Sequence, residues 1–309
     1  MGAASAEKTI EWRGHSGPLL AHIKDHDILD CRACGFRHAI PLPAAHELEE
    51  AYRENYYAEE KPTFLNHAAE DQAWAELAQI DRLEIFERLL PSSRRTLLDV
   101  GSGPGFFLKT AQARGWSVTG IEPSRQAAAY ARELGVKVVE GFFSAESAAT
   151  LGHYDVVHMN NVLEHIPDPI ELVRIARNVM NPGGIICINV PNDFSPFQFA
   201  ASAAHNVRQW WLAPPHHLNY FDFASLTGLV ERLGMTVVER SRSFPMEAFM
   251  MMGENYIDDP VLGRACHTKR KNFDLALDNA GLKSVRRAFY RALAEQGIGR
   301  EVILIARLP

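Results

Sequence analysis

The sequence predicts an α/β protein with a doubly wound, seven-stranded, mostly parallel sheet, a small N-terminal extension and two insertions. Three observations support this fold class. Apolar runs of strand length alternate with segments of helical periodicity from residue 95 onward. A glycine-rich turn, residues 101–105, follows the first of these runs, and open α/β sheets bind ligands at such turns. The 309 residues, 47% of them hydrophobic, are enough for one large domain with additions.

The composition argues against several classes of protein. A net charge of −6 disfavours a nucleic-acid partner, which requires a basic surface. No apolar run approaches the ~18 residues of a membrane span, and the N-terminus lacks the charged and apolar regions of a secretory signal. The four cysteines do not form a disulfide framework. We therefore expect a cytoplasmic protein with no nucleic-acid partner and no membrane span, and the oligomeric state stays open.

Residues 1–43 contain many glycines and prolines and are expected to be rich in loops. Cys31 and Cys34 form a C-x-x-C pair, which is half of a zinc knuckle. A structural zinc ion takes four cysteine or histidine ligands, so two more are needed. None of the nearby histidines has clean ligand spacing; they are His15, His22, His26 and His38. We therefore expect a segment without zinc, in which Cys31 and Cys34 are the candidate ligands if a metal is held.

Residues 44–94 carry apolar side chains at helical spacing and form the predicted helical cover of the domain. The apolar stripe ends at Pro91, which terminates the last helix. Tyr56 and Tyr57 lie in this cover. Their rings either pack on a ligand or brace the helices against the sheet, and bracing is the expected role.

The main domain, residues 95–309, opens with a strand at 96–100, a glycine turn, a helix and a second strand that ends at Glu122. The glycine pattern is G-x-G-x-G, whereas a dinucleotide site has G-x-G-x-x-G with a pyrophosphate on the helix N-terminus. Asp99 precedes the turn, and its carboxylate would repel a pyrophosphate. The turn therefore favours a ligand with no phosphate and a cationic end, such as S-adenosylmethionine, whose ribose hydroxyls Glu122 would bind.

Three motifs carry a resemblance to a known family. They are L-L-D-V-G-S-G-P-G at 97–105, L-E-H-I-P-D-P at 163–169 and H-H-L-N-Y-F-D at 216–222. In this order they resemble the class I S-adenosylmethionine-dependent methyltransferases that act on small molecules and sugars. Several of these enzymes carry an N-terminal zinc ribbon, to which residues 1–43 are similar but incomplete. The resemblance implies a Rossmann-like fold, S-adenosylmethionine as methyl donor and S-adenosylhomocysteine as product.

The cofactor-binding residues are expected at the carboxyl ends of the first four strands, 96–100, 117–121, 136–140 and 154–160. The turn after the third strand lacks the acidic residue that the family commonly places near adenine, so the ring of Phe143 is expected to stack there instead. The predicted set is Asp99, Gly101, Ser102, Gly103, Gly105, Glu122, Pro123, Phe143, Asn160 and Leu163.

Three histidines are candidates for the acceptor side. The family resemblance places His165 near the transferable methyl, where it either acts as a base or holds the loop. His216 and His217 precede a helix that Asp222 caps, which puts them at the mouth of the pocket. An imidazole with a pKa near ~6.5 suits removal of a hydroxyl proton. The alternative for these two histidines is that they only bond backbone carbonyls of the loop.

The remaining strands are expected at 185–190, 235–242 and 301–306, with the last antiparallel to the sixth as the family resemblance implies. Between them lie the two insertions, 191–221 and 243–285. A long connection that leaves the ligand edge of a sheet is usually functional, so the insertions are expected to bind the acceptor.

The sequence thus predicts a methyltransferase that moves a methyl group from S-adenosylmethionine to a small-molecule acceptor by in-line displacement, with a histidine as base. The acceptor classes are a sugar, a nucleotide sugar, or a lipid or quinone precursor, and oxygen, nitrogen and carbon are equally open as the acceptor atom. Two alternatives are an NAD-dependent oxidoreductase and a non-catalytic partner protein that binds S-adenosylmethionine.

Overall fold

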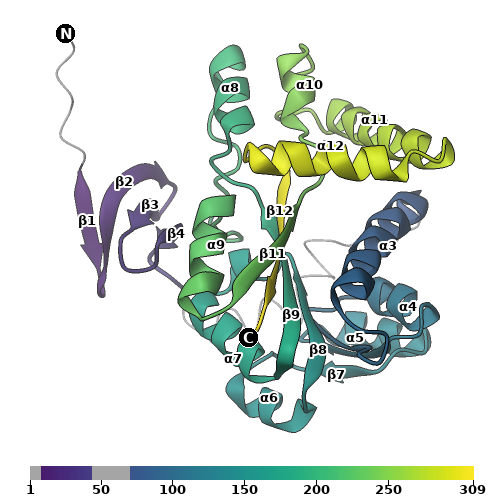
Figure 1. Cartoon of the computed structure of the whole chain (residues 1–309). Helices are drawn as coiled ribbons and strands as arrows, with labels where there is room; N and C mark the ends of the chain where they lie inside the picture. The colour runs from purple at the N-terminus through teal and green to yellow at the C-terminus, as the bar shows by residue number, and fades with distance from the viewer. Residues whose placement is uncertain (1–7, 44–69) are drawn as a thin grey trace.

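The computed structural model describes residues 8–43 and 70–309 and contains two β-sheets (Figure 1). The larger sheet has seven strands, of which only β12 runs antiparallel to its neighbours β9 and β11. This confirms the predicted fold class and the antiparallel last strand. In spatial order the strands are β11 (Thr236–Ser241), β12 (Glu301–Arg307), β9 (Met180–Pro191), β8 (Tyr154–Asn160), β5 (Thr96–Val100), β6 (Ser117–Glu122) and β7 (Val138–Glu140).

Helices cover both faces of this sheet, as a doubly wound fold requires. One apolar core joins the sheet to α3 (Gln72–Leu89), α4 (Phe106–Ala113) and α5 (Arg125–Glu133). The other core joins it to α6 (Ala145–Leu151), α7 (Pro169–Asn178) and α9 (Phe223–Arg232). The cap signals act as the sequence suggests: Asp168 accepts the backbone N–H of Glu171, and Pro169 takes the first position of α7.

The N-terminal segment differs from the loop-rich expectation. It forms an antiparallel sheet of β1 (Thr9–Trp12), β2 (His15–Ile23), β3 (His26–Cys31) and β4 (Phe36–Ile40), completed by β10 (Asn219–Tyr220). Gly14 and Gly35 lie in tight turns between strands rather than in loops. Arg13 and Gly14 have φ values of 47° and 86°, as a two-residue turn between β1 and β2 requires. Tyr56 and Tyr57, in the expected helical cover, lie outside the described residues.

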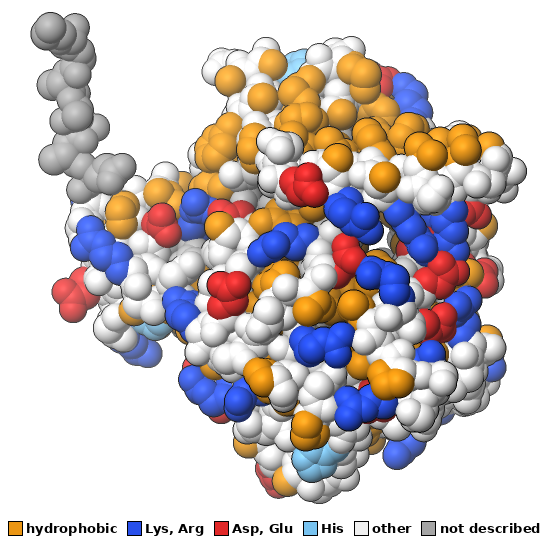
Figure 2. Space-filling model, viewed as in Figure 1, with side chains coloured by type: hydrophobic (Ala, Val, Ile, Leu, Met, Phe, Trp, Pro, Cys, Tyr) orange, Lys and Arg blue, Asp and Glu red, His pale blue; other side chains and the backbone are white. Residues whose placement is uncertain are grey.

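The two insertions and the helix that follows the second one build a helical cap at one end of the large sheet (Figure 1). It consists of α8 (Pro196–His205), α10 (Glu247–Met251), α11 (Pro260–Asn279) and α12 (Lys283–Glu295). Figure 2 shows that hydrophobic side chains gather on this cap. The exposed ones there include Phe199, Met252, Val261, Val285 and Phe289. No helix among the described residues is long and apolar enough to cross a membrane.

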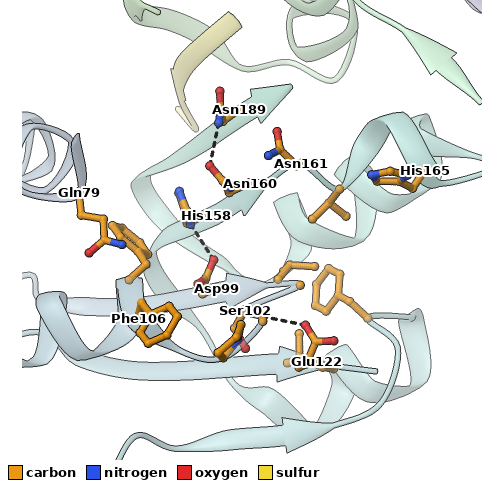
Figure 3. A pocket seen from close by; sticks show the side chains of 18 of the residues that line it. Gln79, Asp99, Ser102, Phe106, Glu122, His158, Asn160, Asn161, His165 and Asn189 are labelled. Atoms are coloured by element: carbon orange, nitrogen blue, oxygen red, sulfur yellow. Dashed lines mark hydrogen bonds and ion pairs between the residues drawn. The ribbon is translucent and has the colours of Figure 1, made fainter. Parts of the chain in front are cut away.

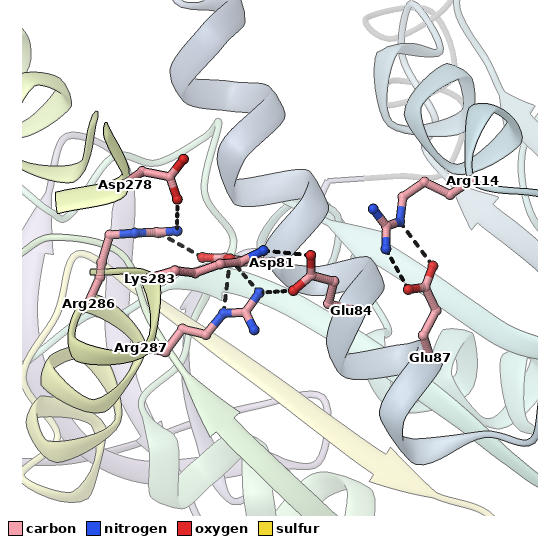
Figure 4. Close-up of polar contacts among 8 residues, drawn as sticks. All are labelled: Asp81, Glu84, Glu87, Arg114, Asp278, Lys283, Arg286 and Arg287. Atoms are coloured by element: carbon pink, nitrogen blue, oxygen red, sulfur yellow. Dashed lines mark hydrogen bonds and ion pairs between the residues drawn. The ribbon is translucent and has the colours of Figure 1, made fainter. Parts of the chain in front are cut away.

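Ion pairs fasten α12 of the cap to α3 (Figure 4). Asp81 of α3 lies 2.7 Å from the guanidinium of Arg286 and 2.6 Å from that of Arg287. Glu84, one turn further along α3, pairs with Lys283 and Arg287. The side chain of Arg286 is only 4% exposed, so its charge depends on these carboxylates. The cap therefore positions α3, which forms one wall of the cavity described next.

Candidate active site

A cavity of about 430 Å³ lies at the carboxyl ends of β5, β6 and β8 (Figure 3). Chain connections leave in opposite directions at β5, and ligands of open α/β sheets bind at such a point. The volume falls within the range of about 300–1,000 Å³ that is usual for small-molecule sites. Its walls come from α3, from the turns after β5, β6, β7 and β8, and from the short helix η2 (Leu163–His165).

The glycine turn brings bare backbone to the floor of the cavity. Gly101 and Gly103 line it with φ values of 68° and 52°, a region that favours glycine. A Cβ on Gly101 would come within 2.8 Å of the Val162 side chain. Ser102 also lines the cavity, and its buried hydroxyl makes no hydrogen bond within the described residues. Gly105 does not line the cavity; it begins α4, and a Cβ there would collide with Ala131 of α5.

Glu122 is held at the end of β6 by two backbone donors. Its Oε2 accepts the N–H of Gly103 at 2.8 Å, and its Oε1 accepts the N–H of Ser124 at 2.9 Å. Only 5% of the residue is exposed. Burial raises the pKa of Glu122 from 4.5 to about 6, while the two backbone donors oppose this shift. At neutral pH the group is therefore a carboxylate aimed at the cavity, able to accept hydroxyl hydrogens.

Asp99 is the end of a buried hydrogen-bonded chain (Figure 3). Its Oδ1 lies 2.6 Å from Nδ1 of His158, and Nε2 of His158 lies 2.7 Å from a guanidinium nitrogen of Arg82. Because arginine can only donate, Nε2 must accept and the proton of a neutral His158 must be on Nδ1, which donates to Asp99. Burial lowers the pKa of His158, in keeping with a neutral ring. The chain fixes the direction of the Asp99 side chain.

Two asparagines extend this polar row to β9. Asn160 Oδ1 accepts from Arg82 at 3.1 Å and from Nδ2 of Asn189 at 2.7 Å. All three side chains line the cavity. The row thus presents one guanidinium and two amides beside the carboxylate of Asp99.

The other end of the cavity is aromatic. Phe142 and Phe143 of the turn after β7 line it together with Pro123. Phe143 is the ring that the sequence analysis places against adenine. Leu163 lies elsewhere than expected: it is fully buried in the core beneath η2 and does not line the cavity.

The three candidate histidines meet at one side of the cavity, but only His165 lines it. Its Nδ1 lies 2.7 Å from the carbonyl oxygen of His216, which can only accept, so Nδ1 carries a proton. The ring of His217 packs edge-on against His165 with centroids 5.0 Å apart. Glu164 is 1% exposed, and its Oε1 lies 3.8 Å from Nε2 of His165. His216 is itself exposed and acts here through its backbone.

Several lining residues are absent from the predicted set. Three of them project from α3, whose sequence predicts only an apolar cover; they are Arg82, Gln79 and Trp74. His158 could have been found from the sequence, because a histidine next to the apolar residues of a buried strand needs a hydrogen-bond partner. The same holds for Asn189 in β9. Cys31 and Cys34 lie in the N-terminal sheet and do not line the cavity.

Comparison with known proteins agrees with this geometry. A family model described as a methyltransferase domain matches residues 68–240. A ubiquinone biosynthesis O-methyltransferase of Methylobacterium nodulans is 33% identical over 159 residues, which are 49% of this chain and 64% of that protein. The enzyme of the same name from Pseudomonas paraeruginosa is 35% identical over 122 residues, 37% of this chain and 53% of that protein. The chain therefore spans between half and two thirds of these curated relatives.

A solved structure supports the fold. The plantazolicin methyltransferase BpumL in complex with SAH aligns over 84% of this chain and 93% of its own, with a TM-score of 0.51 and 14% identity. The family model covers more than half of the chain, and it describes a methyltransferase domain rather than an NAD-dependent oxidoreductase. The chain belongs to the methyltransferase-domain family.

Proposed function

We propose that the protein methylates a hydroxyl oxygen of a small molecule, with His165 as the general base. One observation carries the proposal: His165 lines the same cavity as Asp99, Glu122 and the glycine turn. A donor bound on that turn and an acceptor beside His165 would share one enclosed space. Methyl transfer needs donor and acceptor held about 3 Å apart in line, and positioning supplies most of its acceleration.

The donor fits the cavity in one direction. Glu122 would accept the two ribose hydroxyls, and Phe142 and Phe143 would face the adenine ring. The amino-acid end of the donor would then point along the polar row. There its ammonium group is matched by Asp99 and its carboxylate by the guanidinium of Arg82.

The acceptor side supports base catalysis by His165. With its proton on Nδ1, a neutral His165 keeps the lone pair of Nε2. In the proposed step the acceptor oxygen attacks the methyl carbon, the carbon–sulfur bond breaks, and its electron pair stays on sulfur as S-adenosylhomocysteine. The hydroxyl proton passes to Nε2. The carboxylate of Glu164, 3.8 Å away, stabilises the imidazolium that results.

Oxygen is proposed as the acceptor atom because both reported relatives carry the name O-methyltransferase. Sugars, nucleotide sugars, and lipid or quinone precursors all offer hydroxyl groups. The helical cap borders the site through α3 and would contribute to the choice among them.

The test combines binding with a screen of hydroxylated acceptors. Calorimetry is expected to give micromolar affinity for S-adenosylhomocysteine and none for NADH. With labelled donor, an active hydroxylated acceptor should lose its reactivity when that hydroxyl is blocked as a methyl ether. His165→Asn should then lower kcat by about 100-fold or more, the usual size of a general-base contribution, with donor affinity unchanged. His216→Ala is the matched control, since that side chain is exposed. Full turnover by His165→Asn, or methylation of nitrogen or carbon alone, would refute the proposal.

A further inference from the structure

Four side chains of the N-terminal sheet meet at one point remote in sequence from the cavity. They are His15 of β2, Cys31 at the end of β3, Cys34 in the turn and His38 of β4. Each offers one ligand atom, and all four atoms lie within 4.8 Å of one another. Sequence spacing did not reveal this set, because antiparallel pairing brings His15 next to residues that follow it by 16 and 19 positions.

The distances are those of a tetrahedral metal site. Nδ1 of His15 lies 3.7 Å from Sγ of Cys31 and 3.3 Å from Sγ of Cys34. A tetrahedral zinc ion with Zn–S near 2.3 Å and Zn–N near 2.05 Å places its sulfur and nitrogen ligands about 3.6 Å apart. The observed separations lie on either side of that value.

His38 is oriented as a metal-bound histidine would be. It is 1% exposed, and its Nδ1 lies 3.0 Å from the carbonyl oxygen of Ala39, to which it donates. That bond puts the lone pair on Nε2, a buried atom with no hydrogen-bond partner within the described residues. A ligating histidine characteristically donates its other nitrogen to a carbonyl in this way. The rings of His38 and His15 meet edge to face, 4.7 Å apart.

The backbone around the cysteines is shaped to bring the four ligands together. The N–H of Cys34 points at Sγ of Cys31 at 3.5 Å, and the N–H of Gly35 bonds the carbonyl of Cys31 at 2.8 Å. Gly35 has a φ of 74°, which closes this turn. Gly17 lets β2 approach β3: a Cβ there would lie 1.8 Å from the carbonyl oxygen of Asp30. A larger residue at Gly17 would push the strand that carries His15 away from the cysteines.

We propose that His15, Cys31, Cys34 and His38 bind one structural zinc ion. Two thiolates and two imidazoles in a tetrahedral set are ligands that select zinc, and four protein ligands leave no open position for catalysis. The expectation of a zinc-free segment rested on spacing along the chain, and the fold supplies the two ligands that it lacked. His22, in contrast, pairs with Asp27.

The site also lies where it can stabilise the wall of the cavity. His38 pairs directly with Asn219 of β10, whose amide donates to the carbonyls of Leu163 and Ile166 at either side of His165. The metal would therefore tie the N-terminal sheet to this turn. The zinc proposal stands apart from the role of His165 as a base.

Metal analysis of the full chain tests the proposal. Protein purified without a histidine tag or chelator should contain about one zinc per chain by mass spectrometry. Cys31→Ser and His38→Ala should each reduce the content at least five-fold, and His22→Ala, on the same sheet, should leave it unchanged.

Cobalt substitution gives a readout that does not depend on variants folding. The wild-type chain loaded with Co²⁺ should show the visible bands of tetrahedral cobalt and the near-ultraviolet charge-transfer band of cobalt–thiolate bonds. Less than a tenth of an equivalent of zinc, both as purified and after incubation with Zn²⁺, would overturn the proposal. So would octahedral cobalt spectra, or zinc content that survives both ligand substitutions.

Discussion

Glu122 and Asp99 are buried acidic residues on neighbouring strands, and they have different hydrogen-bond partners. Asp99 lies against a neutral His158 that Arg82 holds in place, whereas the donors to Glu122 among the described residues are backbone N–H groups. Burial raises the pKa of Glu122 to about 6, and the charge of Asp99 adds to this shift. In the unliganded protein, Glu122 therefore contributes about 2 kcal/mol to the free energy of unfolding below pH 4.5, where the group is protonated. This contribution is lost as the pH rises through 6.

The raised pKa of Glu122 predicts pH-dependent donor binding. In the proposed donor complex only the ionised form of Glu122 can accept both ribose hydroxyls, so affinity for S-adenosylhomocysteine should be flat above pH 7 and about ten-fold weaker at pH 5. Calorimetry from pH 5 to 7.5 measures this. Glu122→Gln should bind more weakly at every pH and lose the dependence. Equal wild-type affinity at pH 5 and pH 7 would contradict the assignment.

Arg82 is predicted to recognise the amino-acid end of the donor. Losing a charged hydrogen bond costs about 1.5–3 kcal/mol, so Arg82→Gln should weaken S-adenosylhomocysteine binding about 10- to 100-fold. 5′-Methylthioadenosine lacks the amino-acid group, and its affinity should change much less. Arg88→Gln is the control, on the same helix but paired with Glu239 at the surface. A similar loss for both ligands would show that Arg82 acts only through His158 and Asp99.

At the scale of elements, α3 is held from two sides by ion pairs of different burial. Its pairing with α12 includes the buried Arg286, whereas Glu87 pairs with Arg114 of the α4 end at a partly exposed site. An exposed pair contributes little, but removing one partner of a buried charge leaves the other uncompensated. The position of α3 in the cavity wall should therefore depend mainly on α12.

Asp81→Asn tests this dependence. It leaves Arg286 with Asp278, 3.7 Å away, as its remaining carboxylate partner among the described residues. We expect a loss of about 3 kcal/mol, or roughly 6 °C in Tm, by thermal unfolding. Glu87→Gln, the matched control, should cost less than about 1 kcal/mol. Equal effects of the two variants would show that burial of the pair does not decide its contribution.

At the scale of the whole molecule, β10 joins the two sheets. It adds the fifth strand to the N-terminal sheet, yet it belongs to the insertion that leaves β9 of the large sheet. Leu218 donates its N–H to the carbonyl of Glu164, and Ala39 of β4 donates to the carbonyl of Leu218. These bonds connect the N-terminal sheet to the turn that carries His165.

Asn219→Leu should weaken the contact between β10 and the turn at 163–166 without affecting the proposed binding site of the methyl donor. The substitution keeps the branched side-chain shape but leaves the carbonyls of Leu163 and Ile166 without the amide, at a cost of about 1–3 kcal/mol each. Hydrogen exchange of residues 163–166 should accelerate at least ten-fold, with S-adenosylhomocysteine affinity unchanged. Asn178→Ala, at an exposed position at the end of α7, is the control. Unchanged exchange at 163–166 would mean that β10 does not hold the turn.

Local sequence patterns were enough to predict much of the large sheet. Apolar runs indicate its strands, and Asp168–Pro169 and Asp222 mark the helix starts where the structure has them. The glycine turn and Glu122 are adjacent to such runs, so their place at the ligand edge follows from strand direction alone. Leu163 was misplaced because its side chain turns into the core, and a motif does not show the direction of a side chain.

By itself, the sequence determined the seven-stranded sheet, the glycine turn at its ligand edge and the methyltransferase family, because strand runs, caps and glycine turns are properties of neighbouring residues. Only the tertiary structure decided which distant residues meet. Arg82 reaches His158 across 76 positions, and His38 pairs with Asn219. Such contacts depend on how helices and strands pack when apolar surface is buried, so the separation of two residues along the sequence does not predict them.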